Sequence, residues 1–227
     1  SSILGAKLGG SPAWAGVPSA VYLLGGAFAA SAWGYLMDVF GRRNGIALGL
    51  VSGAVGSILA IVSINSGAFI GFLFAMLLMG VGNAAVVLGR FAAAEVNPPE
   101  KRGSAISSVV LGGTFGAVFG PLIVGPAGAL TKTWGMDELS GAYAASFVLF
   151  ALAAVLVFLA LRPDPRDVGR ELAKLYPELP GESQNLDGTA RSTWVILQQP
   201  KAFTALMAMV LGQVVMVAGK GVTSLPL

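Results

Sequence analysis

The sequence predicts an all-α protein built as a polytopic bundle of transmembrane helices. Hydrophobic residues make up 55% of the chain, charged residues only 11%, and the mean hydropathy is +0.78. A soluble domain averages about 25% charged residues. Several apolar runs also reach the roughly 20 residues that a helix needs to cross a bilayer. The lipid bilayer is therefore the expected surrounding of a multi-pass protein.

Five complete spans are expected, in order along the chain. Their approximate bounds are 16–38, 44–64, 68–94, 104–127 and 141–161, and a sixth span begins near residue 202. The Ser1–Gly10 segment is expected to be the tail of an earlier helix whose body is missing. Because the chain starts without Met and stops at Leu227 within an apolar pattern, we interpret it as a fragment of a longer protein.

The basic residues predict which loops face the cytoplasm, because orientation follows Lys and Arg in short loops. Eleven of the fourteen fall in alternate gaps between the spans, whereas the other gaps hold only Lys7 and Lys132. The connections 39–43, 95–103 and 162–201 are therefore predicted to be cytoplasmic. Orientation explains the pI near 9.4, and no nucleic-acid partner is expected.

The chain lacks the residues of several functional classes. It has no Cys and no His, so disulfides and the usual zinc sites are excluded, and neither a metal nor a cofactor is expected. No nucleophile–base pair falls within the spans, which argues against an enzyme. A membrane-embedded sensor or assembly protein without flux stays open as an alternative to a transporter.

A short motif joins the first two complete spans. It reads Gly34-Tyr-Leu-Met-Asp38-Val-Phe-Gly41-Arg42-Arg43. It resembles G-x-L-x-D-x-x-G-R-[KR], the loop between the second and third helices of the major facilitator superfamily, and departs from it at Val39, where a basic residue is common. Two further stretches are similar to bacterial members of that superfamily: Arg90-Phe-Ala-Ala-Ala-Glu-Val-Asn-Pro-Pro-Glu-Lys-Arg-Gly103 and Leu161-Arg-Pro-Asp-Pro165.

This resemblance implies a secondary transporter of the inner (plasma) membrane that moves a small-molecule substrate by alternating access. Residues 1–161 would form most of the first transmembrane half, from the end of helix 1 to helix 6. Residues 162–201 would form a cytoplasmic linker, with a short amphipathic helix over 167–176, and residues 202–227 a truncated first helix of the second half. The missing second half is then an expected partner.

A charge network at the cytoplasmic face is the predicted gate. We expect Asp38 to pair with Arg42 and Arg43, and Glu95 to pair with Arg90, Lys101 and Arg102. In the family the aspartate of this loop engages the second half and steadies the outward-open form, which implies a gating role for Asp38 and Arg43. The alternative is that these charges only set topology. The candidate gating residues are Gly34, Asp38, Gly41, Arg42, Arg43, Glu95 and Arg102.

The fourth span carries a second signature. Its segment from Gly112 to Pro126 resembles the superfamily's antiporter pattern G-x-x-x-G-P-x-x-G-G, departing from it at Val124, and this resemblance implies efflux by antiport. Proline removes a helix hydrogen bond, so a kink is expected beside it. Glycines four residues apart permit close helix packing, either static or sliding. The candidate kink and packing residues are Gly116, Gly120, Pro121 and Gly125.

Few polar side chains fall within the spans. Asn83 is the best candidate for a residue facing a substrate pathway, and an interhelical hydrogen bond is its alternative. Gln213 and Lys220 lie seven residues apart near one face of the last span, although Lys220 could snorkel to the outer interface. Trp33 is deeper than the other tryptophans and is expected to line the cavity.

Overall fold

The computed structural model describes residues 2–175 together with five later positions. The chain divides into two compact units, Ser1–Leu175 and Tyr176–Leu227. The described residues of the second unit are helical: Thr204, Met207, Ala208, Leu211 and Gly212. The expectations for Gln213, Lys220 and the linker beyond Leu175 fall outside the described residues.

Within residues 2–175 the secondary structure is helical throughout. The α-helices are α1 (Ser2–Gly9), α2 (Val17–Phe40), α3 (Arg42–Ser66), α4 (Phe69–Glu95), α5 (Arg102–Thr133), α6 (Gly141–Ala160) and α7 (Pro165–Leu175). Short 3-10 turns occupy Pro12–Trp14, Pro99–Lys101 and Glu138–Ser140. Five helices, α2 to α6, are long and apolar enough to cross a membrane, which confirms the five predicted spans.

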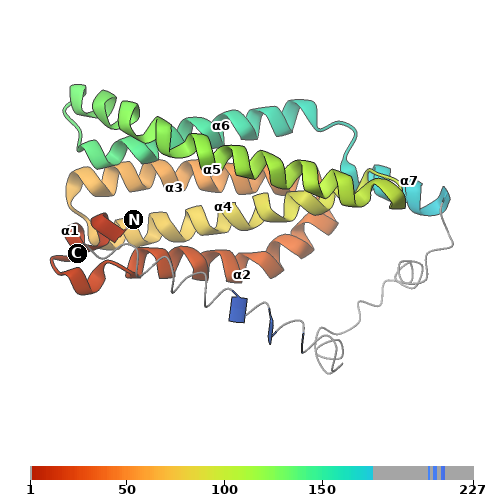
Figure 1. Ribbon diagram of the computed structural model, residues 1–227, viewed down its shortest axis with the longest axis horizontal. Helices are drawn as coiled ribbons and strands as arrows, with labels where there is room; N and C mark the ends of the chain where they lie inside the picture. The colour runs from red at the N-terminus through yellow and green to blue at the C-terminus, as the bar shows by residue number, and fades with distance from the viewer. Residues whose placement is uncertain (1, 176–203, 205–206, 209–210, 213–227) are drawn as a thin grey trace. The chain divides into compact units, whose positions relative to one another are not determined.

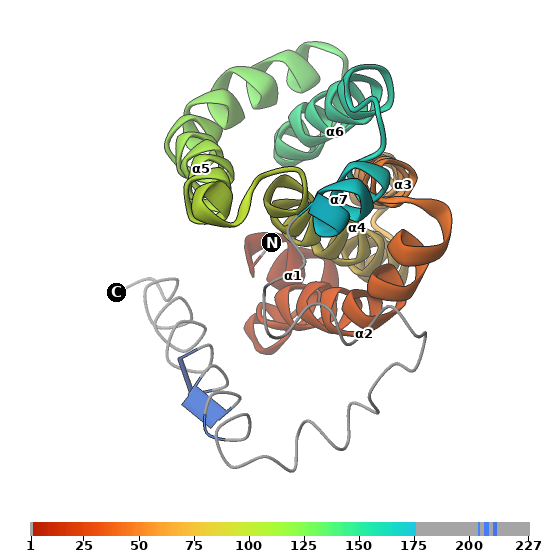
Figure 2. The same ribbon diagram turned by 90° about the vertical axis from the view of Figure 1, so that its right-hand side faces the viewer.

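The long helices run beside one another along one axis, and α7 lies past one end of them (Figure 1). α4 packs against both α2 and α3, and α6 packs against α3. α5 lies at the edge of the group, beside α4 and α6 (Figure 2). The predicted amphipathic helix in the linker is present as α7, although it begins at Pro165, two residues before the expected start.

α5 is longer than the sequence predicts. It continues through Pro121 and Pro126 without interruption and ends at Thr133, past the expected end near residue 127. Its stop signal is Gly135, whose φ of 75° lets the chain turn back so that the Gly135 N–H donates to the Lys132 carbonyl. Figure 2 shows α5 following a curved path. A kink centred on Gly120 and Pro121 stays a prediction.

Glycines set the spacing between α3 and α4. A Cβ on Gly82 would lie 2.7 Å from the carbonyl oxygen of Gly49 and 2.8 Å from the backbone nitrogen of Gly53. Neither backbone atom can move aside without shifting its helix. Gly80 meets α2 in the same way, at the carbonyl of Tyr22. Small residues thus bring the backbones of neighbouring helices into contact, as packing in lipid requires.

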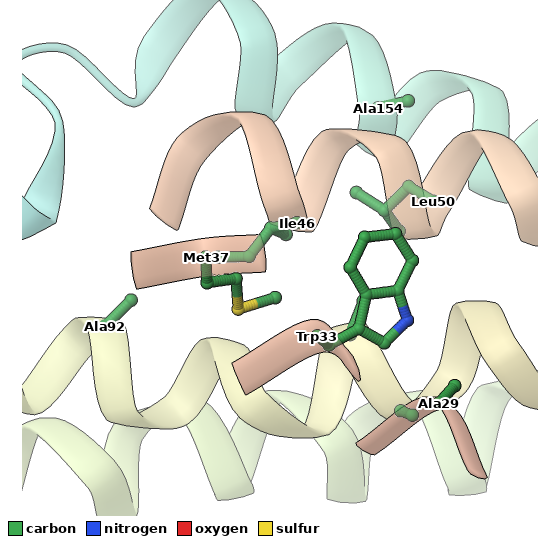
Figure 3. Packing of buried hydrophobic residues seen from close by; sticks show 9 residues of the cluster. Ala29, Trp33, Met37, Ile46, Leu50, Ala92 and Ala154 are labelled. Carbon is green, nitrogen blue, oxygen red and sulfur yellow. The ribbon is translucent and has the colours of Figure 1, made fainter. Parts of the chain in front are cut away.

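Side chains from four helices fill the core around these contacts. Figure 3 shows Trp33 and Met37 of α2 pointing toward Ile46 and Leu50 of α3, with Ala92 of α4 nearby. Met37 is fully buried and Trp33 is 8% exposed. The Trp33 indole N–H donates to the carbonyl of Val81 at 2.8 Å, so its polar atom is satisfied within the core.

The glycine face of α5 differs from that of α3. A Cβ placed on Gly112, Gly116, Gly120 or Gly125 would meet no atom of the described residues within 4 Å. Large apolar side chains along the same helix are exposed, among them Phe115 and Phe119, which stack on each other with ring centroids 6.4 Å apart. No described helix therefore packs closely against the glycine face of α5.

A polar contact joins α1 to the turn between α5 and α6. The ammonium group of Lys7 donates to Asp137 at 2.5 Å, and the Asp137 backbone N–H donates to Asn65 at 2.9 Å. The hydrogen bond from Lys7, helped by the Leu139 N–H, lowers the pKa of the Asp137 carboxyl below its ordinary value of 3.8. By the distribution of Lys and Arg, this end of the bundle is predicted to face away from the cytoplasm.

The glycine contacts predict an asymmetric response to alanine. We expect Gly82→Ala to destabilise the protein by about 1–3 kcal/mol, because the added methyl forces α3 and α4 apart. Gly103→Ala is the matched control, since a Cβ there meets nothing within 4 Å and alanine favours a helix. Thermal unfolding in detergent measures both. Equal melting temperatures for Gly82→Ala and the parent would contradict this account of the packing.

The Lys7–Asp137 contact predicts a stability term that disappears in acid. Because the folded-state pKa of Asp137 lies below 3.8, the carboxylate stabilises the fold above that value. The contribution is lost as the pH falls through the lowered pKa. We expect Asp137→Asn to melt below the parent at pH 7 and the difference to vanish in the most acidic buffers. A difference that persists at all pH values would show that the charge is not responsible.

Candidate functional site

Charged side chains gather at the end of the bundle where α2 meets α3 and where α4, α6 and α7 end or begin. We name this group the inner charge cluster, since the basic residues predict that it faces the cytoplasm. It comprises Asp38, Arg42, Arg43, Glu95, Asp164 and Arg166. The cluster joins three separate segments of the sequence.

Arg42 is the centre of the cluster. Its guanidinium binds the Glu95 carboxylate through two nitrogens, with Nε 3.0 Å from Oε2 and Nη2 2.6 Å from Oε1. The same Nη2 lies 3.2 Å from Oδ1 of Asp38. A two-pronged contact of this kind fixes orientation as well as charge. Arg42 therefore connects the end of α4 to the end of α2.

The two acids that bind Arg42 differ in exposure. The Glu95 side chain is 32% exposed, the Arg42 side chain 19%, and the Asp38 side chain 66%. Glu95 is also approached by α7, where a Cβ on Gly169 would lie 3.3 Å from the Glu95 backbone. Asp38 thus keeps most of its carboxylate surface available to a further donor.

Asp164 caps the start of α3. Gly41, the residue before that helix, has no side chain to accept from the first free N–H groups. The Asp164 carboxylate accepts instead from the Arg42 N–H at 3.0 Å and from the Arg43 N–H at 3.2 Å. Its Oδ1 also accepts from the Arg166 N–H at 2.9 Å, at the start of α7. One carboxylate therefore caps two helices.

Two arginines bind backbone carbonyls around the same turn. Arg43 donates from Nε and Nη2 to the Phe158 carbonyl of α6, and its guanidinium lies 4.4 Å from the centroid of the Phe158 ring. Nη1 of Arg166 donates to the carbonyls of Asp38 at 3.1 Å and Val39 at 3.0 Å, in the last turn of α2. These bonds join α6 and α7 to the α2–α3 turn.

One of the five predicted pairings, all between described residues, forms in the structure, and the other four do not. Asp38 pairs with Arg42, as expected. Arg43 is turned by roughly 100° from Arg42 around the helix and so reaches α6 instead of Asp38. Glu95 binds Arg42 rather than its neighbours in sequence, because α4 ends beside the start of α3. The expected partners lie elsewhere: Arg102 donates to the Asn97 carbonyl, and Arg90 lies over Phe91.

The other predicted site residues fall in different surroundings. Trp33 is part of the core between α2, α3 and α4, so its role in a pathway stays a prediction. Asn83 is half-buried at the middle of α4 and makes no side-chain hydrogen bond with the described residues, so the interhelical bond is not formed there. Gly34 is half-buried, and a Cβ on it would meet no described atom within 4 Å. Gln213 and Lys220 lie outside the described residues.

Sequence reasoning missed Asp164, Arg166 and Phe158 as members of the cluster. One signal was present: Asp164 directly precedes Pro165, and an acid followed by proline is typical of a helix start. The second helix that Asp164 caps gives no local signal, since it lies more than a hundred residues earlier. Among residues 2–175, no group of His, Cys, Asp and Glu side chains is arranged to hold a metal ion.

The comparisons with known proteins agree on one family. The sequence model of the Major Facilitator Superfamily (MFS) matches residues 1–227. The uncharacterized MFS-type transporter YdeG of Bacillus subtilis is 30% identical over 217 residues, and YddS of the same organism is 29% identical over 219 residues. Each alignment covers 96% of this chain and 49% of the relative.

A third relative has a named substrate and aligns over a shorter part of the chain. The riboflavin transporter RfnT of Brucella anthropi is 30% identical over 185 residues, which cover 76% of this chain and 44% of the relative. No solved structure gives a significant match. The chain spans about half the length of the curated relatives that it matches. With a family match over the full chain and five helices able to span a membrane, this protein is a multi-pass member of the major facilitator superfamily.

Proposed function

We propose that the full-length protein is a secondary transporter that moves a small molecule by alternating access, and that this chain supplies most of its first half. Residues 1–161 form the helices of that half, residues 162–201 the linker, and residues 202–227 the first helix of the second half. The family and the transporter relatives support this proposal. The observation that carries it is the inner charge cluster, whose exposed acid is positioned to meet a second body.

Asp38 is the proposed gate residue. Arg42 holds one of its oxygens at 3.2 Å, while 66% of the side chain is exposed. When the second half closes on this face, a donor from it can bind Asp38 while Glu95 retains Arg42. When the halves separate, Asp38 loses that donor and keeps only its pairing with Arg42. The cluster thus remains paired in both states, and only the contact to the second half is made and broken.

The substrate pathway is proposed to pass Asn83, whose amide is half-buried at mid-membrane without a described partner. Asp38 and Glu95, the carboxylates of the described spans, both lie at the inner ends of their helices. These spans therefore offer no mid-membrane carboxylate for proton coupling. The α5 signature around Gly120 and Pro121 supports efflux by antiport, and the relative RfnT makes riboflavin the first compound to assay.

Two-sided access to Asn83 tests the proposal without knowledge of the substrate. The chain contains no cysteine, so Asn83→Cys adds a single reactive thiol to it; any cysteine in the remainder of the full-length protein is replaced first. We expect a membrane-impermeant maleimide to label this thiol in both inside-out and right-side-out vesicles. Val55→Cys, at a similar depth on the exposed side of α3, is the control and should resist labelling.

Labelling from both sides supports alternating access. Labelling from one side only, in the full-length protein, would favour the sensor or assembly protein that has transporter helices and no flux. If the thiol is labelled from neither side, Asn83 does not lie on the pathway. Uptake or efflux of radiolabelled riboflavin in the same vesicles then tests that substrate separately.

The gate residue predicts a shift in that labelling. Loss of a hydrogen bond to a charged group costs about 1.5–3 kcal/mol, so Asp38→Asn should change the ratio of inner to outer labelling at Asn83→Cys by roughly tenfold or more. Because Asp38 steadies the form closed to the cytoplasm, the change should favour inner labelling. Glu100→Gln removes an exposed acid on the same face and serves as control. An unchanged ratio at equal surface abundance would mean that Asp38 only sets topology.

A further inference from the structure

The inner charge cluster contains a pair of opposite charges that the gate does not use. Asp164 and Arg166 belong to the start of the linker, two residues apart, and both contact the turn between α2 and α3. The Asp164 carboxylate binds the first N–H groups of α3, while the Arg166 guanidinium binds the last carbonyls of α2. An acid and a base from one short segment therefore hold the two helix ends on either side of Gly41.

The signs of these charges match the helix ends that they bind. A helix carries a partial positive charge at its N-terminus and a partial negative charge at its C-terminus. Asp164 meets the positive end of α3, and Arg166 meets the negative end of α2. Exchanging the two charges would turn both contacts into repulsions. The match at both ends distinguishes this arrangement from an incidental surface contact.

Gly41 makes the approach of the linker possible. Its φ of 94° is a conformation that other residues rarely adopt, and it is the whole connection between α2 and α3. A Cβ on Gly41 would collide with Oδ2 of Asp164. The turn and the linker therefore meet at Gly41, and a side chain at this position would displace the Asp164 carboxylate.

We propose that Asp164 and Arg166 form a clamp that fixes the α2–α3 turn and joins α7 to it as one body. The clamp is a positioning element: by holding the Arg42 backbone, it directs the guanidinium to Glu95 and leaves Asp38 facing outward. This inference rests on the proposed gating role of Asp38. It adds that the linker takes part in the gate, since α7 moves with the turn.

The surroundings of α7 support this coupling. Gly169 packs against the end of α4 at Glu95, so the helix is held on a second side. Arg166 also binds Asp167 at 3.2 Å, which orients its guanidinium from its own helix. α7 is therefore attached to the ends of α2, α3 and α4 and not only to α6, which it follows in the chain.

A distance measurement tests the clamp without any substrate. Spin labels at Phe40→Cys and Leu175→Cys, which are 59% and 75% exposed, report the separation of the turn and α7 in the full-length protein in liposomes. We expect one narrow distance distribution in the parent, a broadened one in Asp164→Ala, and intermediate broadening in Asp164→Asn, which keeps an acceptor oxygen without charge. Glu171→Ala removes an exposed acid from the same helix and should change nothing. A distribution unaltered in both Asp164 variants would overturn the clamp.

The labelling ratio at Asn83→Cys tests whether the clamp positions the gate. A positioning role predicts that Asp164→Asn shifts this ratio in the same direction as Asp38→Asn, by about threefold or more. The double variant should then equal Asp38→Asn alone. A purely structural role would lower the amount of inserted protein and leave the ratio per inserted molecule unchanged, which would overturn the positioning role.

The two measurements separate failure of the clamp from failure of the gate. A ratio that responds to Asp38→Asn but not to Asp164→Asn supports the gate and rejects its positioning by the clamp. If the distance distribution broadens in Asp164→Ala while neither variant moves the ratio, the clamp holds α7 to the turn and the proposed gate is rejected. An unaltered distance with an altered ratio at Asp38→Asn rejects the clamp alone.

Discussion

A single residue, Gly41, connects two helices of 24 and 25 residues. The structure of the inner end of the bundle depends on which groups form hydrogen bonds with the backbone of these two helix ends. Each helix leaves several backbone groups without partners at its end. A one-residue connection supplies no side chain to pair with them. Asn44 pairs one of these groups locally, the Phe40 carbonyl. Asp164 and Arg166, in the segment that follows α6, pair two N–H groups of α3 and two carbonyls of α2. The tight turn between α2 and α3 is thus stabilised by contacts with a segment more than a hundred residues later in the chain.

The same requirement explains why the cluster is rich in arginine. Arg43 and Arg166 bind carbonyl oxygens at helix ends, and Arg42 binds two carboxylates at once. Arginine presents several donors in a fixed plane, so one side chain can bridge groups from different helices. These residues join the helix ends through their geometry, and their charge is predicted to orient the protein in the membrane.

The sequence predicted the helices well because the spacing of apolar runs reflects the thickness of the bilayer. The bounds of α2, α3, α4 and α6 differ from expectation by a few residues, whereas α5 continues past its expected end near residue 127 to Thr133. The helix ends two residues before Gly135, whose left-handed backbone turns the chain. In the site, the Asp38–Arg42 pair was predictable because its members lie on either side of one short turn. The contacts of Glu95 and Asp164 were not, because they depend on which helix ends are neighbours in space.

Glycine spacing illustrates the same limit. α3 and α5 carry glycines at matching intervals, Gly45–Gly49–Gly53 and Gly112–Gly116–Gly120, and sequence alone gives them equal meaning. In α3 that face meets side chains and backbone of α2, α4 and α6, whereas the face of α5 meets no described neighbour.

Since hydrophobicity does not draw helices together in lipid, a face of small residues gains stability only when another surface fits it closely. The chain spans about half the length of its curated relatives, and the second half of the proposed transporter is the surface available for α5. In the proposed transporter, the open glycine face of α5 suits a helix that changes neighbours during transport, whereas the close contacts of α3 and α4 suit helices that move together as one body.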